Sequence, residues 1–134
     1  MNIVSAMKTA AIASVAVFAF TPATAQAPDL EMLDRLERGA WTINFRGGEP
    51  SQRICLRTGR EFIQLQHRQP GCDRFVVADG PAEVTVQYTC RGNGYGRTTI
   101  RRESNSLVQV NSQGVRAGRP FSMVGEARRT GSCR

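Results

Sequence analysis

The sequence predicts a mainly β domain: a single antiparallel sheet, curled or partly closed into a barrel, with its strands following one another as a meander. Apolar residues alternate with polar ones along several short segments, and turn-forming stretches such as the Gly-Gly-Glu-Pro at 47–50 separate these segments. Strands at this spacing, joined by hairpins, form one antiparallel sheet. Four cysteines add two expected disulfides.

The first 25 residues have the three-part organisation of a secretory signal peptide. A positively charged start containing Lys8 precedes an apolar run over 9–20, and Ala23-Thr24-Ala25 provides small residues for cleavage after Ala25. The apolar run is shorter than the roughly 20 residues that cross a bilayer. A retained anchor or a buried helix is the alternative. We therefore expect a signal peptide over 1–25, a single domain over 26–134, and a periplasmic or secreted location.

The cysteines indicate an oxidising compartment. An even number in a small exported domain is typical of disulfides. A zinc site with four thiolates is the alternative, but the usual Cys-x-x-Cys spacing is missing. We expect no metal and no cofactor. The four disulfide cysteines are Cys55, Cys72, Cys90 and Cys133.

The expected domain is basic through arginine alone. After loss of Lys8 it has 17 arginines and 11 acidic residues, and 17 minus 11 gives a formal net charge of +6. Such a surface attracts anionic partners, such as lipid headgroups or acidic polysaccharide. Because the arginines are scattered, an ordinary solvated surface is the alternative. The candidate anion-binding residues are Arg97, Arg101, Arg102, Arg128 and Arg129.

One short helix is predicted over 28–39, ahead of the strands. Asp29 can cap its start and Gly39 can end it. Leucines recur on one stripe that would dock on the sheet, and two acid-before-base pairs four residues apart would support the turns. The leucines are Leu30, Leu33 and Leu36, and the pairs are Glu31 with Arg35 and Asp34 with Arg38.

The first hairpin and a second helix follow. Alternation predicts strands over 41–46 and 52–57. Thr58 and Glu61 then have the spacing of a capping box, which predicts a short helix to about Gln66 that buries Phe62 and Leu65.

The remaining chain predicts the meander. Strands are expected over 74–78, 84–90, 97–102 and 107–111, with a flexible turn at 92–96 and a Gly-containing connection over 112–119. The last strand would turn one row of residues inward. That row is Phe121, Met123, Gly125 and Ala127.

The order of these features resembles a known family. The features are Gly39-x-Trp41 at the first strand, Cys55-Leu56 before a capped helix from Thr58, Cys72, Cys90 ending a strand, and Gly131-x-Cys133. Together they resemble the small exported bacterial proteins grouped as domain of unknown function 3617, over essentially the whole expected domain. The resemblance implies an envelope or secreted location and an antiparallel β domain, and it implies no activity.

The residues do not predict catalysis. His67 is the only histidine and stands beside Arg68 in a polar segment, which predicts a surface residue. No serine lies in a Gly-x-Ser-x-Gly elbow, and the acidic residues are scattered. The glycines at 92–96 lack the Lys-Ser/Thr of a phosphate-binding loop. We expect no catalytic residue and no nucleic-acid partner.

Three functions remain open. A non-enzymatic envelope protein would bind a small apolar ligand within its curled sheet, although a packed core explains the same apolar row. A binder of anionic lipid or polysaccharide would use the surface arginines. A hydrolytic enzyme is the disfavoured alternative.

Four cysteines allow three pairings, and we expect Cys55 with Cys72 and Cys90 with Cys133. The first pair brackets the short capped helix, whose ends must return to the same part of the sheet. The second pair would join the end of one strand to the C-terminus if the sheet curls.

Overall fold

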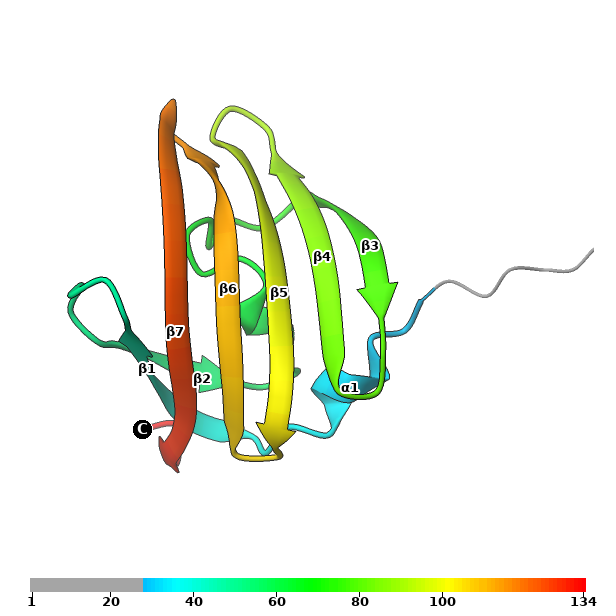
Figure 1. The fold of residues 1–134 in the computed structure, drawn as a ribbon, viewed down its shortest axis with the longest axis vertical. Coiled ribbons are helices and arrows are strands. Elements are labelled where there is room, and N and C mark those ends of the chain that lie inside the picture. Colours follow the sequence, from blue (N-terminus) through cyan, green and yellow to red (C-terminus); the bar gives the residue numbers. More distant parts are fainter. Residues whose placement is uncertain (1–27) are drawn as a thin grey trace, which may run out of the picture.

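The computed structural model describes residues 28–134, which form one antiparallel sheet of seven strands and two short helical turns (Figure 1). The expected signal peptide over 1–25 lies outside the described residues. In chain order the elements are α1 Glu31–Asp34, β1 Gly39–Phe45, β2 Gln52–Leu56, the 3-10 turn η1 Arg60–Phe62, β3 Asp73–Asp79, β4 Glu83–Cys90, β5 Gly94–Ser104, β6 Leu107–Arg116 and β7 Arg119–Gly131.

The strand order is β2-β1-β7-β6-β5-β4-β3, so the prediction of a mainly β, antiparallel fold is confirmed. The meander runs from β3 to β7, and the first hairpin, β1–β2, then joins the free side of β7. The sheet is open, with β2 and β3 as its edges. We call the gap between these two edge strands the seam.

The core lies on one side of the sheet, where α1 and the segment over 57–72 cover the strands (Figure 1). Trp41 of β1 and Phe62 of η1 meet edge to face with ring centroids 5.4 Å apart, and both are fully buried. Because aromatic side chains bury large areas, this contact is a main attachment of the segment to the sheet. The expected inward residues Phe62 and Leu65 are confirmed as buried.

The N-terminal helix is a single turn, Glu31–Asp34, and the predicted helix over 28–39 is wrong in length. Asp29 does not cap it, because Leu30 precedes the turn in a left-handed conformation, and Gly39 begins β1. A helix this short depends on tertiary contacts. Those contacts redirect the chain: the Glu37 N–H donates to the Asn105 carbonyl at 2.8 Å. The three stripe leucines are nevertheless buried, as expected: Leu30, Leu33 and Leu36.

The second helix is also shorter than predicted. Glu61 accepts the Thr58 N–H at 3.2 Å, which is one half of the expected capping box, but Thr58 Oγ1 accepts the Arg60 N–H instead of that of Glu61. The helix does not continue to Gln66, because a residue of the sheet forms a hydrogen bond with its backbone. The carbonyl of Ile63 accepts the Thr98 hydroxyl at 2.7 Å.

The connection predicted over 112–119 is wrong, since β6 continues to Arg116 and β7 begins at Arg119. The reversal needs only the two residues Ala117 and Gly118, both with positive φ. The predicted turn at 92–96 is shorter as well, because β5 begins at Gly94.

The disulfides join Cys55 to Cys133 and Cys72 to Cys90, so the expected pairing is wrong. Strand register explains both bonds. Ala40 of β1 lies opposite Cys55 on one side and opposite Gly131 on the other, which brings the C-terminus to β2. Cys72 directly precedes Asp73, whose partner Thr89 directly precedes Cys90.

Candidate functional site: an arginine-lined pocket at the seam

A surface hollow with a volume of about 610 Å³ opens at the seam. Residues of both edge strands and of the segment over 57–72 line it, so one continuous stretch of chain, from Arg53 to Arg74, builds it. Its lining contains four arginines and one carboxylate: Arg53, Arg60, Arg68, Arg74 and Glu61.

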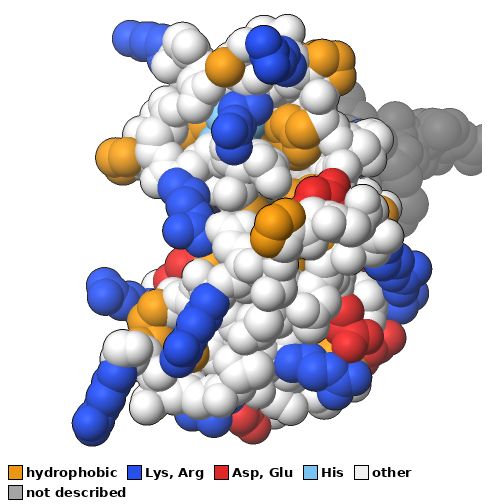
Figure 2. Space-filling view, turned by 90° about the vertical axis from the view of Figure 1, so that its left-hand side faces the viewer, with side chains coloured by type: hydrophobic (Ala, Val, Ile, Leu, Met, Phe, Trp, Pro, Cys, Tyr) orange, Lys and Arg blue, Asp and Glu red, His pale blue; other side chains and the backbone are white. Residues whose placement is uncertain are grey.

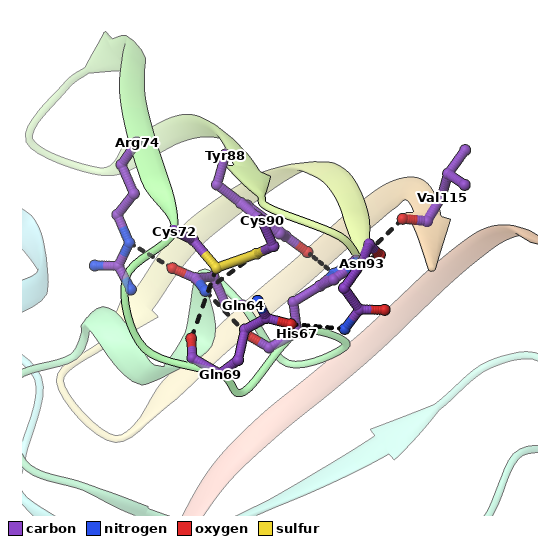
Figure 3. Close-up of a disulfide and its surroundings, with 9 residues drawn as sticks. All are labelled: Gln64, His67, Gln69, Cys72, Arg74, Tyr88, Cys90, Asn93 and Val115. Carbon is purple, nitrogen blue, oxygen red and sulfur yellow. Dashed lines mark hydrogen bonds between the residues drawn. A yellow bond between two sulfur atoms is a disulfide. The ribbon is translucent and has the colours of Figure 1, made fainter. Parts of the chain in front are cut away.

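Arg74 begins the β3 side of the pocket and is held by Gln64. Its Nε–H donates to Gln64 Oε1 at 2.7 Å (Figure 3). Gln64 is buried, and its amide nitrogen donates to the His67 carbonyl at 2.9 Å. A buried side chain with both ends of its amide engaged fixes the orientation of the guanidinium that it contacts.

Two effects lower the pKa of Arg74, burial first and neighbouring positive charge second. Partial burial of its guanidinium lowers the pKa of Arg74, and the neighbouring charge of Arg60 lowers it further, while Glu61 opposes the shift. Arg74 as a whole residue is exposed, so the burial concerns the part of the side chain that faces Gln64. An anion placed here would relieve the repulsion between the two guanidinium groups.

Arg60 is the most constrained arginine of the pocket. Its Nη1 donates to Asp34 Oδ1 at 2.5 Å and to the Thr58 carbonyl at 2.8 Å, and its Nη2 donates to the Asp29 carbonyl at 2.7 Å. The hydrogen bond from Arg60 is the main reason that the pKa of Asp34 is lowered. Arg60 therefore joins α1 to the pocket wall and keeps its charge beside Arg74.

The carboxylate of Glu61 faces the backbone. Glu61 accepts the N–H groups of Arg57 at 3.1 Å and Thr58 at 3.2 Å. These bonds direct its negative charge to the loop that enters η1.

His67 forms part of the inner wall and is 1% exposed, so the prediction of a surface histidine is wrong. Its Nε2 lies 2.9 Å from the Asn93 carbonyl and 3.1 Å from the Val115 carbonyl, and its Nδ1 lies 2.9 Å from the Tyr88 hydroxyl (Figure 3). Two carbonyls require a proton on Nε2, so in the neutral ring Nδ1 accepts from Tyr88. Burial raises the pKa of Tyr88, which keeps this hydroxyl protonated.

This arrangement attaches the segment over 57–72 to β4, to the turn between β4 and β5, and to the end of β6. The partners of His67 come from Tyr88, Asn93 and Val115, which lie 21 to 48 residues away in the sequence. Local pattern could not reveal them, because an imidazole becomes buried only when distant backbone carbonyls converge on it.

None of the five arginines chosen from the sequence lines the seam pocket, and two of them, Arg101 and Arg128, are linked through Glu103, Gln109 and Glu126. Three contact nearby carboxylates: Arg101 with Glu103 at 3.3 Å, Arg128 with Glu126 at 2.9 Å, and Arg129 with Glu37 at 3.8 Å. Arg102 donates to Asn105 and to the Pro81 carbonyl, and Arg97 is exposed on β5.

Figure 2 shows arginine side chains projecting at many separate points on one side of the molecule. The convergence at the seam was missed by sequence reasoning, because Arg53 and Arg74 lie on opposite edge strands. Only the path of the chain between those strands brings them together.

The fold and the pocket define a small, disulfide-bonded, open β-sheet domain with a basic site at its seam. No protein-family model, no curated protein and no solved structure matches the chain. Within residues 28–134, no helix has the length and apolar character needed to cross a membrane, and no group of three or more metal-ligating side chains occurs.

Proposed function

We propose that this chain is an exported, non-enzymatic binding protein of the periplasm or the extracellular space, and that the seam pocket binds a phosphate or carboxylate group. The observation that carries this proposal is the convergence of Arg53, Arg68 and Arg74 on one hollow. We retain the resemblance to the family of small exported bacterial proteins as part of the proposal.

The chemistry of the arginines supports an anionic ligand. A guanidinium presents paired donors that match the oxygens of phosphate and carboxylate. Among the residues that the structure describes, no ion pair joins Arg53, Arg68 or Arg74 to a carboxylate. Their charges are therefore available to a ligand, and Gln64 already orients that of Arg74.

The compartment is supported by the covalent structure. Two disulfides account for all four cysteines and are compatible with an extracellular location. The N-terminal pattern over 1–25, which resembles a secretory signal peptide, also supports export.

The hydrogen bonds of His67 and Glu61 at the pocket favour binding over hydrolysis, because neither side chain is free to act as a base. Both ring nitrogens of His67 have internal partners, and Glu61 is engaged by backbone N–H groups. A general base needs a free lone pair within reach of its substrate. The side chains that fill the concave face also favour a surface site over an apolar ligand inside the sheet, notably Phe62 and Ile63, which are fully buried.

The test is calorimetric titration of the disulfide-bonded domain with glycerol 3-phosphate, together with sedimentation with phosphatidylglycerol or phosphatidylcholine vesicles. We expect binding to the anionic probes that weakens as salt rises, since exposed charges are screened over about 8 Å at physiological ionic strength. Binding of the soluble ester assigns the site to a free phosphate compound, and binding of phosphatidylglycerol alone assigns it to a lipid headgroup.

A matched pair of double variants locates the site. Arg68→Gln with Arg74→Gln should abolish binding, whereas Arg101→Gln with Arg128→Gln removes the same charge outside the pocket and should leave binding nearly unchanged. Equal losses in both double variants would show a nonspecific effect of net charge. No binding of any probe at low salt would refute the proposal.

A further inference from the structure

A second hollow crosses the solvent-facing side of the sheet over β4, β5, β6 and β7, with a volume of about 520 Å³. We call it the cross-strand groove. Strand register arranges its lining in two parallel rows. The polar row is Gln87, Arg97, Gln113 and Ser122, which are successive cross-strand partners, and the apolar row is Tyr95, Val115 and Pro120.

The floor between the two rows is backbone. Gly96 and Gly114 are cross-strand partners there, and a Cβ at Gly114 would lie 2.1 Å from the Tyr95 carbonyl oxygen. Neither residue can carry a side chain without displacing a neighbour, since a Cβ at Gly96 would lie 2.4 Å from the Tyr88 hydroxyl. The close approach of β6 to β5 thus depends on Gly114, and Gly96 leaves room for the Tyr88 side chain of β4.

The two walls differ in chemistry. Tyr95 is 52% exposed and offers a ring beside the aliphatic surfaces of Val115 and Pro120. The opposite wall offers the amides of Gln87 and Gln113, each with donors and an acceptor. Arg97 adds one cation, and among residues 28–134 no carboxylate lines the groove.

We propose that the cross-strand groove binds a glycan chain that contains acidic sugars. A pyranose ring has an apolar face of C–H groups and a rim of hydroxyls, which fit one aromatic wall and one amide wall respectively. A sugar carboxylate would accept paired hydrogen bonds from Arg97. The volume lies within the range of about 300–1,000 Å³ that small-molecule sites occupy.

This site is separate from the seam pocket. The groove is lined by residues of β4 to β7, whereas the seam pocket is lined by β2, β3 and the segment between them, and the two linings share no residue. The test of one proposal therefore does not decide the other.

The test is titration of the domain with oligogalacturonate, an acidic glycan, and with maltohexaose, a neutral one. We expect the acidic chain to bind more tightly. Tyr95→Ala should weaken binding about tenfold, equivalent to 1.4 kcal/mol, while Tyr95→Phe should retain it because the ring stays. Arg97→Gln should remove the preference for the acidic chain.

Two controls make the outcome decisive. Arg101→Gln removes the same charge outside the groove, and Arg68→Gln with Arg74→Gln disables the seam pocket. Both should keep glycan binding. Loss in these controls comparable to that in Tyr95→Ala, or no binding of either glycan by the native domain, would overturn the proposal. Melting curves of Tyr95→Phe and Arg97→Gln confirm that these variants are folded.

Discussion

Cys133 is bonded to Cys55 across 78 positions of sequence, because β1 lies between the C-terminal strand and β2 and pairs with both. The bond therefore ties the C-terminus to the edge strand β2. Arg53 supports the same junction by donating to the Ser132 carbonyl at 3.5 Å.

The first prediction concerns this disulfide. Peptide mapping without reduction should yield a Cys55–Cys133 peptide and a Cys72–Cys90 peptide. In the loop-entropy model, separations of 78 and 18 residues correspond to stabilisation of roughly 4.5 and 3 kcal/mol. Replacing Cys55 and Cys133 with Ala should therefore lower the unfolding free energy more than replacing Cys72 and Cys90. A Cys55–Cys72 peptide would contradict the structure.

The second prediction concerns His67. Replacing it with Ala leaves the Tyr88 hydroxyl and the Asn93 and Val115 carbonyls without this partner, in a buried site. We expect a loss of about 2–4 kcal/mol in the unfolding free energy, measured by urea denaturation. Arg68→Ala is the matched control, because the adjacent Arg68 is exposed, and it should change stability by less than about 0.5 kcal/mol. Equal stability of the two variants would show that the His67 contacts contribute little.

The third prediction concerns acid pH. The hydrogen bond from Arg60 lowers the pKa of Asp34 below its ordinary value of 3.8. Because the folded-state pKa lies below that of the unfolded chain, the stabilising contribution is present above pH 3.8 and is lost as pH falls through the folded-state pKa. Asp34→Asn should therefore reduce stability at pH 7, and this loss should shrink as pH falls through the folded-state pKa of Asp34.

NMR titration of the Asp34 carboxyl provides the direct measurement. Its midpoint should lie below 3.8 in the native protein and should rise in Arg60→Gln. An unchanged midpoint in that variant would mean that Arg60 does not cause the shift.

Local sequence pattern predicted the strands well where burial alternates along one segment. Trp41 and Ile43 are buried on one face of β1, and Val84 and Val86 on one face of β4, as the period of two requires. It failed at Ser112, which was expected in a connection. Ser112 is buried in β6 and shares a hydrogen bond of 2.7 Å with Thr98 of β5, and a buried hydroxyl of this kind has no apolar signature in sequence.

The candidate site was only partly predictable. The excess of arginine predicted anionic ligands, which stays a prediction, and it could not show which guanidinium groups converge. Arg74 and Arg60 line the same pocket because the chain between β2 and β3 folds back over the sheet, and Gln64 holds Arg74 there through a hydrogen bond. These are contacts between segments that a local pattern treats as independent.

The sequence by itself determined the class of fold, the stripe of leucines that docks before β1 and the presence of four cysteines suited to disulfides. Each of these follows from residues close together in the chain, through strand and helix periodicity or composition. Tertiary structure alone decided that β1 pairs with β7, that Cys55 meets Cys133, and that His67 is buried. Pairing partners depend on strand order, and strand order is set by which arrangement buries the apolar faces of the whole chain at once.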